Sequence, residues 1–378
     1  MKKVLLVAMA DSIHTARWLE QFRGEPIQFV LFPSSPHRRV HPKIREMLAS
    51  DEGVNLRIDG LLRRFALPMW AVDRFIDNRL RGVLLKQIIR REKPDIVHAM
   101  EFQHGAYLVI RAFDKLVTRP YFIATNWGSD IYWFQRFPRH ERKIQEVLKL
   151  ANAYSAECQR DHELAKQHGF VGLHLPVAPN AGGFSDQHLK QAALFPRPST
   201  RKVIAIKGYT GFVGRADIAL RAIELAADHL GGFEIVVFSS DMKSRLISRG
   251  VSKRTGLELR TYRRHELSHA EMLELFARSR IYIGISESDA ISTSMLEAMS
   301  CGAFPIQTDT SCADEWISNG ETGFIADLNS PKQIAKNIVT SIADENLVNS
   351  AAAKNLEVAK LRLRDSQIRL KLKEFYVH

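Results

Sequence analysis

Short apolar runs alternate along the chain with longer segments in which apolar residues recur every three or four positions. The short runs predict buried strands and the longer segments predict amphipathic helices. This alternation is typical of parallel sheets covered by helices on both faces. In the first half of the chain we expect strands at 3–9, 27–32, 95–99, 121–125 and 153–157. In the second half we expect them at 202–207, 234–238, 257–261, 281–285, 303–307 and 323–327.

Proline and glycine gather between the two sets of strands. Residues 176–183 read Pro-Val-Ala-Pro-Asn-Ala-Gly-Gly, which predicts a linker. We therefore expect an α/β protein with two doubly wound, Rossmann-like domains, residues 1–183 and 184–359, and a last helix at about 360–378 that packs back on the first domain. Such domains bind ligands at the carboxyl ends of their strands, so two facing domains would enclose a cleft.

Length and cysteine content agree with this organisation. The 378 residues, 45% of them hydrophobic, can form two separate cores. The three cysteines, Cys158, Cys301 and Cys312, form no CxxC pair, which favours a reducing cytoplasm over a disulfide framework or a zinc site. The first apolar run is short and meets Asp11, so it predicts a strand rather than a signal peptide. No apolar stretch has the length of a membrane span.

Residues 286–302 carry the strongest candidate chemistry: an apolar strand, a hydroxyl-rich turn, and a strongly helix-forming segment follow one another. The start of such a helix exposes unpaired N–H groups and the positive end of the helix dipole, which can hold a diphosphate. Asp289 lies before the turn and Glu297 about one turn into the helix. Carboxylates are poor phosphate ligands but accept hydrogen bonds from sugar hydroxyls. The spacing therefore suits a nucleotide-sugar.

A structural interpretation of the same residues is open. Ser294 and Glu297 fit a capping box, in which the serine caps the helix and the glutamate bonds back to its N–H. Asp289 could equally be an Asx-turn residue.

The run from Ser286 to Gly302, continued by Phe304-Pro305-Ile306, Glu315-Trp316-Ile317 and Thr322-Gly323-Phe324, resembles the carboxy-terminal domain of glycosyltransferase family 4. These are retaining enzymes of the GT-B fold. Their signature is a glutamate, seven residues, and a second glutamate followed by Ala-Met; Asp289 replaces the first glutamate here. The resemblance implies that Glu297 holds the nucleotide ribose and Asp289 the sugar hydroxyls. It also implies that backbone N–H groups of Ile291, Ser292, Thr293 and Ser294 hold the diphosphate.

The second domain opens with a strand, a glycine-rich loop and a helix start, where the backbone can approach phosphate closely. The family places an arginine and a lysine in this loop. Aligned by its glycines, from Gly208 onward, this chain has Tyr209 and Gly214 at the positions of that arginine and lysine, with the cations Lys207 and Arg215 next to them. Gly208 and Tyr209 of this loop are donor-binding candidates. We expect these two cations to compensate the diphosphate charge, although each could be an ordinary surface residue. Tyr262 follows a strand where the family places the nucleotide base, and its ring could stack on that base or be structural.

In the first domain, residues 94–105 resemble the family's strand end with its His-x-His motif, whose second histidine position is Met100 here. Glu101 and His104 are the catalytic candidates of this segment, together with Asp289 of the second domain. His98 lies within the strand, where a histidine is more often structural. The run Asn126-Trp127-Gly128-Ser129-Asp130 resembles the family's Gly-Ser-Asp loop.

Acceptor contact is the role we assign to the remaining polar groups of the first domain. Asp130 could line the acceptor side or cap the next helix. The first strand is followed by Asp11, Ser12 and His14, which place polar groups at a helix start. Together with His98 these residues form the acceptor-side candidates.

Basic residues concentrate between 61 and 93, where nine stand against three acids and are interleaved with large apolar side chains. This segment could lie on an anionic membrane surface, or it could be a solvated helix packed on the first domain. Resemblance to enzymes that glycosylate lipid-linked acceptors favours peripheral contact with the inner face of a membrane. The net charge of +12 and pI of about 9.6 do not indicate nucleic acid, because no recognition motif accompanies them.

The resulting hypothesis is a cytoplasmic, retaining hexosyl-type glycosyltransferase of bacterial-type surface polysaccharide or lipopolysaccharide assembly. It would move a sugar from a nucleotide diphosphate to a hydroxyl of a glycan or lipid-linked acceptor. No Asp-x-Asp motif is present, so we expect no metal and no cofactor besides the donor. A GT-B nucleotide-sugar epimerase and a catalytically inactive nucleotide-sugar-binding subunit are the alternatives.

Overall fold

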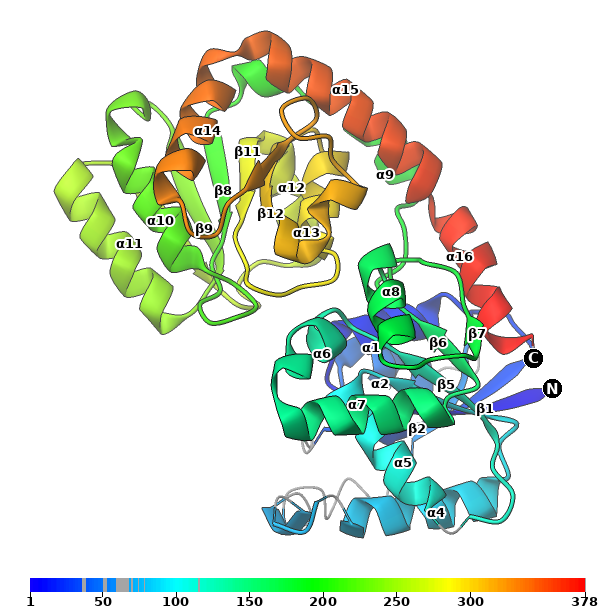
Figure 1. Ribbon diagram of the computed structural model, residues 1–378. Helices are drawn as coiled ribbons and strands as arrows, with labels where there is room; N and C mark the ends of the chain where they lie inside the picture. The colour runs from blue at the N-terminus through cyan, green and yellow to red at the C-terminus, as the bar shows by residue number, and fades with distance from the viewer. Residues whose placement is uncertain are drawn as a thin grey trace. The chain divides into compact units, whose positions relative to one another are not determined.

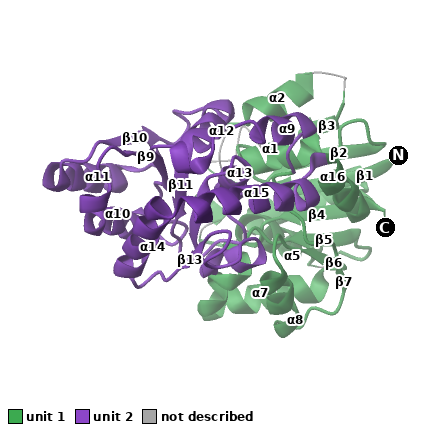
Figure 2. Cartoon of the chain, turned by 90° about the horizontal axis from the view of Figure 1, so that it is seen from above, with its two compact units in different colours: residues 1–182, 366–378 green, residues 183–365 purple. Residues whose placement is uncertain are grey.

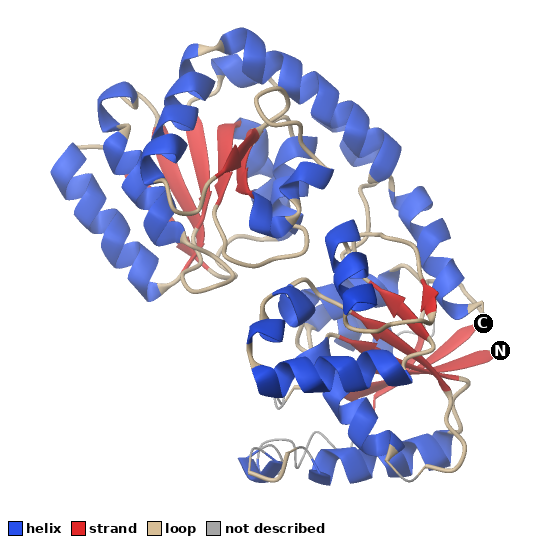
Figure 3. Ribbon diagram, viewed as in Figure 1, coloured by secondary structure: helices blue, strands red, loops and turns tan. Residues whose placement is uncertain are grey.

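The computed structural model of the chain describes residues 1–35, 39–49, 53–58, 68, 71–73, 75–77, 79–114 and 116–377. It divides into two compact units (Figure 2). Unit 1 comprises residues 1–182 and 366–378, and unit 2 comprises residues 183–365. Each unit is a parallel sheet with helices on both faces (Figures 1 and 3), which confirms the predicted pair of doubly wound domains.

Unit 1 contains a seven-stranded sheet in the order β3-β2-β1-β4-β5-β6-β7. Its strands are β1 (Lys2–Ala8), β2 (Ile27–Pro33), β3 (Asn55–Ile58), β4 (Ile96–Met100), β5 (Tyr121–Thr125), β6 (Ala153–Ser155) and β7 (Leu173–His174). Its helices are α1 (Ile13–Glu20), α2 (Pro42–Ala49), α4 (Arg79–Glu92), α5 (Tyr107–Phe113), α6 (Ser129–Tyr132), α7 (Pro138–Leu150), α8 (Gln159–Gln167) and α16 (Asp365–Lys373). A π-helical turn, η1 (Phe102–Ala106), precedes α5.

Two apolar cores cover the faces of this sheet. One joins the strands to α4, α5, α7 and α8, and the other joins them to α1, α2 and α16. The second core includes Phe375 and Tyr376, so the end of the chain is part of unit 1. Because both faces are buried, the central strands read as continuous apolar runs rather than alternating ones.

Unit 2 contains a six-stranded sheet in the order β10-β9-β8-β11-β12-β13. Its strands are β8 (Val203–Lys207), β9 (Glu234–Ser240), β10 (Leu259–Arg263), β11 (Ser279–Gly284), β12 (Phe304–Thr308) and β13 (Phe324–Ala326). Its helices are α9 (Asp186–Ala192), α10 (Ala216–Leu225), α11 (Met242–Thr255), α12 (His269–Arg278), α13 (Thr293–Ser300), α14 (Pro331–Ala343) and α15 (Glu345–Arg362). Helices α10, α11 and α14 cover one face, and α9, α12 and α13 the other.

Every strand that the apolar pattern predicts is present, with ends shifted by at most two residues. The pattern misses β3 and β7, which lie at the two edges of the unit 1 sheet. Strand β3 is only four residues long and alternates exposed with half-buried positions, and β7 has two residues. Such short edge strands bury too little apolar surface to stand out in a sequence.

Candidate functional site

The order of strands reverses once in each sheet, between β1 and β4 in unit 1 and between β8 and β11 in unit 2. At such a point the loops that follow the two central strands diverge, and ligands of doubly wound folds bind between them. In unit 2 the loops at this point are 208–215 and 285–292. In unit 1 they are 9–12 and the turn that begins at Glu101. These four loops carry most of the residues that the sequence singles out.

Helix α13 begins behind the loop that follows β11. Its N-cap is Ser292, no side chain caps it, and Ser294 lies inside its first turn. The predicted capping box of Ser294 and Glu297 is therefore not formed. In the described part of the chain, the N–H groups of Thr293 and Ser294 meet no acceptor. The helix start thus keeps the unpaired donors that an anion can accept from, while Ile291 and Ser292 are buried beside it.

Lys207, the last residue of β8, reaches across to this loop. Its Nζ lies 3.2 Å from Asp289 Oδ2 and 3.5 Å from Ser292 Oγ. Burial lowers the pKa of Lys207, but the charges of Asp289, Tyr282 and Tyr209 together with the hydrogen bond to Asp289 outweigh burial and raise that pKa above its ordinary value. Only 11% of the Lys207 side chain and 26% of the Asp289 side chain are exposed. The loop edge therefore presents a permanent cation beside a carboxylate.

Tyr282 of β11 also contacts this loop. The sequence did not indicate that it belongs to the site. Its buried hydroxyl lies 3.1 Å from Ser292 Oγ and 2.9 Å from Ser294 Oγ, and the two serine oxygens are 3.1 Å apart. The hydroxyl thus ties the N-cap residue to the first turn of α13. A tyrosine inside an apolar strand gives no signal in the sequence that its hydroxyl points at a loop.

Glu297 of α13 is buried, and its Oε1 lies 2.8 Å from Nε2 of His269, the first residue of α12. A second imidazole, that of His188 of α9, lies 3.1 Å from Ser300 Oγ, one turn further along α13. Burial lowers the pKa of His188, although the charge of Glu297 opposes this. The carboxylate is therefore held by His269 of α12 rather than by the start of its own helix. Sequence separation hides both histidines from a motif search.

The loop after β8 packs tightly against its neighbours. A Cβ atom at Gly208 would lie 2.6 Å from the carbonyl oxygen of Phe238, and one at Gly214 would lie 2.4 Å from Tyr209 Cβ. Thr210 N donates to Asp241 Oδ2 at 2.9 Å, which fastens the loop to the start of α11. Glycine at positions 208 and 214 is what allows this close approach.

Arg215 closes this loop with two ion pairs. Its guanidinium donates to both oxygens of Asp217, at 3.0 and 3.2 Å, and to Glu287 of the neighbouring loop. The hydrogen bonds with Asp217 raise the pKa of Arg215. The structure thus places this predicted diphosphate ligand as a link between the two loops, with carboxylates on its donors.

Two tyrosines were predicted to contact the nucleotide. The Tyr209 ring has Lys207 Nζ at 5.5 Å and the Arg264 guanidinium carbon at 6.0 Å from its centroid. Tyr262 is partly buried against the core that contains α12 and α13, and its carbonyl accepts from Ser240 Oγ at 2.8 Å. Tyr209 therefore lies near the cations Lys207 and Arg264. Tyr262 is the second-last residue of β10, just before the connection to α12.

In unit 1, the loop after β1 holds the first group of acceptor-side candidates. Ser12 caps α1 by accepting from His14 N at 3.1 Å. Ser35, which follows β2, donates to Asp11 Oδ1 at 3.2 Å. The His14 ring meets the Trp127 ring edge-on, with centroids 5.6 Å apart. The loops after β1, β2 and β5 are thus joined through these residues.

Glu101 begins the π-helical turn in a strained conformation. Its φ of 81° and ψ of 151° fall in a region that is almost exclusive to glycine and costs other residues about 1–3 kcal/mol. Its Oε2 accepts from His104 N at 2.9 Å, and its Oε1 is buried without a partner among the described residues. His104 itself is exposed. The residue before them, Met100, is fully buried in the core, so the second position of the His-x-His motif faces away from solvent.

Asp130 lies in the first turn of α6, directly after the loop that follows β5, and is buried. Its Oδ2 accepts from Trp127 N at 2.8 Å and from Phe102 N at 3.2 Å, so it joins its own loop to the π-helical turn. Burial raises the pKa of Asp130 to about 7. Burial, reinforced by the charge of Asp130, raises the pKa of Glu101 well above its ordinary value. The two carboxyl groups thus flank the start of η1 in a low-dielectric environment.

His98, an acceptor-side candidate, is a structural residue in this geometry. It is fully buried, its Nδ1 lies 2.7 Å from Tyr376 Oη and its Nε2 lies 2.6 Å from Thr125 Oγ1. Burial lowers the pKa of His98 to about 3, so the imidazole is neutral.

The basic segment 61–93 is described only in part, since residues 61–67, 69, 70, 74 and 78 lie outside the described residues. In the remainder, Arg81 is buried and pairs with Asp73 at 3.1 Å. Large apolar side chains are exposed at five nearby positions: Val72, Phe75, Ile76, Leu80 and Val83. No helix in the described ranges is both long and apolar enough to cross a membrane.

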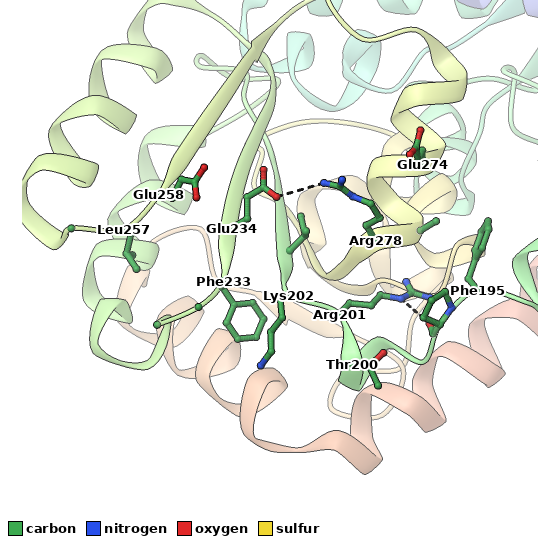
Figure 4. Close-up of a pocket in the computed structure, with 16 residues that line it drawn as sticks. Phe195, Thr200, Arg201, Lys202, Phe233, Glu234, Leu257, Glu258, Glu274 and Arg278 are labelled. Atoms are coloured by element: carbon green, nitrogen blue, oxygen red, sulfur yellow. Dashed lines mark hydrogen bonds and ion pairs between the residues drawn. The ribbon is translucent and has the colours of Figure 1, made fainter.

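A cavity of about 940 Å³ lies at the amino ends of the unit 2 strands, at the opposite edge of the sheet from the loops 208–215 and 285–292 (Figure 4). Lys202, Glu234 and Glu258, which line it, precede or begin β8, β9 and β10. Figure 4 shows Arg278 directed toward Glu234, and these side chains pair at 3.5 Å. None of the predicted site residues lines this cavity.

Comparisons with known proteins agree with the fold. Residues 251–357 match the family model of glycosyl transferases group 1, and residues 78–157 match that of glycosyl transferase 4-like proteins. The first match covers α12, β11 and α13, and the second covers β4 and the loop after β5. No curated protein matches the chain.

Solved structures share the whole fold. Anabaena Alr3699/HepE in complex with UDP-glucose has a TM-score of 0.69 at 14% identity, over 99% of each chain. Sucrose-phosphate synthase from Thermosynechococcus elongatus has a TM-score of 0.71 at 12% identity, over 100% of this chain and 98% of that one. The lipopolysaccharide outer core galactosyltransferase WaaB, in its apo form, has a TM-score of 0.67 at 13% identity, over 98% of each chain. With the two family matches, this fold supports a GT-B glycosyltransferase.

Proposed function

We propose that the protein is a retaining glycosyltransferase of family 4 type. It transfers a hexosyl group from a nucleotide diphosphate sugar to a hydroxyl group of a glycan or lipid-linked acceptor. The observation that carries this proposal is the Lys207–Asp289 pair at the start of α13, where a cation, a carboxylate and unpaired N–H groups meet. A sugar diphosphate needs all three: donors and positive charge for its phosphates, and acceptors for its hydroxyls.

The donor would bind at the carboxyl edge of the unit 2 sheet. The diphosphate accepts hydrogen bonds from the N–H groups of Thr293 and Ser294 and from the Lys207 ammonium. Asp289 accepts hydrogen bonds from the sugar hydroxyls, and Glu297 accepts them from the ribose hydroxyls. Arg215 serves this site by holding the loops 208–215 and 285–292 together through Asp217 and Glu287. Among the similar structures, HepE is in complex with UDP in one and with UDP-glucose in another, which supports a donor of this class.

In the reaction, the acceptor oxygen forms a bond to the anomeric carbon while the bond from that carbon to the phosphate oxygen breaks. The acceptor approaches on the side of the leaving group, and its proton passes to the departing phosphate. Negative charge grows on the diphosphate, so Lys207 and the helix start act mainly in the transition state. This route requires no metal ion and no protein base. The polar residues at the carboxyl edge of unit 1, including Asp11, His14 and His104, would contact the acceptor.

The first test is Glu297→Ala. We expect nucleotide affinity, measured by calorimetry with UDP, ADP and GDP, to fall about tenfold or more, because hydrogen bonds to a charged group are lost. Glu321→Ala, on the surface of the same unit, is the control and should keep the affinity of the unaltered protein. Unchanged affinity in a folded Glu297→Ala protein would remove this residue from the site. Isomerisation of a donor sugar without any transfer would instead contradict the reaction proposed.

Attachment to a membrane surface is part of the proposal. Phe75 is 87% exposed, and Val72, Ile76, Leu80 and Val83, which are close to it in the sequence, are exposed as well. Helix α4, which begins in this stretch, carries arginines at its start and at its end. Exposed apolar side chains beside basic ones suit the interface of an anionic bilayer. We propose that this surface places the enzyme at the cytoplasmic face of a membrane that carries a surface-polysaccharide or lipopolysaccharide acceptor.

Vesicle sedimentation tests this attachment. We expect binding to vesicles with phosphatidylglycerol and little binding to pure phosphatidylcholine. Phe75→Ala should weaken binding about tenfold, because burial of a phenylalanine side chain contributes about 1.5–3 kcal/mol. Val117→Ala, at an exposed position of the same unit, is the control. Equal binding to both vesicle types, or full binding by Phe75→Ala, would contradict membrane attachment through this surface.

A further inference from the structure

The imidazole of His269 is held in a defined position beside Glu297. His269 is the first residue of α12, directly after the N-cap Ser268. A capping box fixes this helix start: Glu271 N donates to Ser268 Oγ at 3.3 Å, and Ser268 N donates to Glu271 Oε2 at 2.7 Å. The backbone that carries the imidazole is therefore anchored on both sides of the cap.

The contact with Glu297 determines which ring nitrogen carries hydrogen. An ionised carboxylate can only accept, so Nε2 of His269 must donate across the 2.8 Å to Oε1. In the neutral imidazole, Nδ1 is then an acceptor. The ring is 53% exposed while the Glu297 side chain is 9% exposed. His269 therefore covers the carboxylate and keeps part of its own ring in solvent.

A carboxylate that is anchored through one oxygen cannot rotate freely. Glu297 lies one turn inside α13, behind the unpaired N–H groups of Thr293 and Ser294. With Oε1 fixed by α12, the plane of the carboxylate is set relative to the helix start that would hold the diphosphate. A carboxylate with a fixed orientation distinguishes better between ligands that carry a hydroxyl group at a set distance from the phosphate and ligands that lack it.

We propose that His269 is a positioning residue that makes the donor site prefer ribose to 2′-deoxyribose. The inference rests on the proposed function, in which Glu297 receives the ribose hydroxyls. A site built to hydrogen-bond a hydroxyl rejects a ligand that lacks it, because a buried polar group is then left unpaired. Without His269 this anchor on Oε1 is lost, the orientation of the carboxylate is less restricted, and the penalty for the missing hydroxyl falls.

The experiment compares ribonucleotides with their deoxy counterparts by calorimetry. UDP, ADP and GDP are first titrated into the unaltered protein to choose the tightest ligand, and its 2′-deoxy form is then titrated. In His269→Ala we expect affinity for the ribonucleotide to fall about tenfold, while that for the deoxynucleotide changes little. His269→Gln, whose side-chain amide can again donate to Glu297, should restore part of the preference. His229→Ala, at an exposed position of the same unit, is the control.

The outcomes separate this inference from the function on which it rests. Loss of the ribose preference in His269→Ala with partial recovery in His269→Gln supports it. An unchanged ratio of the two affinities, or an equal loss of both, overturns the role of His269 and leaves the donor site standing. Failure of the unaltered protein to bind any of the three nucleotides overturns the proposed function and the inference together.

Discussion

The carboxylates of this protein differ in what surrounds them. Asp289 faces Lys207, and Glu297 faces His269. Glu101 and Asp130 are buried and accept hydrogen bonds from backbone N–H groups at the start of a π-helical turn. The first two carboxyl groups thus have a side-chain cation or imidazole as partner. Buried ones that lie close together resist ionisation.

Asp130 should make the stability of the protein depend on pH. Burial raises its pKa from 3.8 to about 7. Because the folded state holds this proton more tightly than the unfolded chain does, the stabilisation is complete below about pH 4 and is lost as pH rises through 7. Each unit of pKa corresponds to about 1.4 kcal/mol. In Asp130→Asn, we expect the urea midpoint to decline less steeply between pH 4.5 and 7.5.

Asp186→Asn is the matched control for this experiment, because 65% of the Asp186 side chain is exposed. It should keep the pH dependence of the unaltered protein. A midpoint that declines equally in the Asp130→Asn protein would show that Asp130 ionises in the folded state as it does in water.

At the scale of elements, the donor loop depends on close approach between backbone segments. Gly208 touches the carbonyl oxygen of Phe238 in the neighbouring strand, and Thr210 is fastened to Asp241 at the start of α11. Arg215 joins this loop to the one after β11. The position of Lys207 relative to α13 therefore follows from how two loops pack, and not from any one residue.

Gly208→Ala should disturb this packing. The added Cβ would lie 2.6 Å from the Phe238 oxygen, so the loop must shift. We expect nucleotide affinity to fall several-fold, with a loss of stability of about 1–3 kcal/mol. Gly231→Ala is the control, because a Cβ at Gly231 meets open space. Calorimetry and urea unfolding on both variants would check this, and normal affinity in Gly208→Ala would show that the loop tolerates displacement.

At the scale of the whole molecule, the chain leaves unit 1 at residue 182 and returns to it at residue 366. A chain of hydrogen bonds anchors the returning segment. Trp18 Nε1 donates to Tyr376 Oη at 3.0 Å, and the same oxygen lies 2.7 Å from His98 Nδ1. His98 Nε2 in turn lies 2.6 Å from Thr125 Oγ1. The end of the chain is thus part of the fold of unit 1.

Tyr376→Phe tests this anchor. Removing the hydroxyl leaves the Trp18 N–H and a nitrogen of His98 buried without partners, which costs about 1–3 kcal/mol for each group. We expect the midpoint of urea unfolding, measured by circular dichroism, to be lower than in the unaltered protein. Val377→Ala changes an exposed neighbour in the same tail and should have no such effect. Equal midpoints for the two variants would mean that the hydroxyl contributes nothing to unit 1.

The amino-acid sequence was sufficient to predict every strand except β3 and β7, the order of the elements and the polar loops, because burial on both faces of a parallel sheet imposes continuous apolar runs. It also indicated that Asp289 and Glu297 lie near a helix start, since residues close in the chain share a loop. The partners of these two carboxylates depend on the three-dimensional fold. Lys207 lies 82 residues from Asp289, His269 lies 28 from Glu297, and Tyr376 lies 278 from His98. Such contacts arise when strands distant in the chain become neighbours in a sheet. The local pattern of apolar residues does not predict which strands will be neighbours.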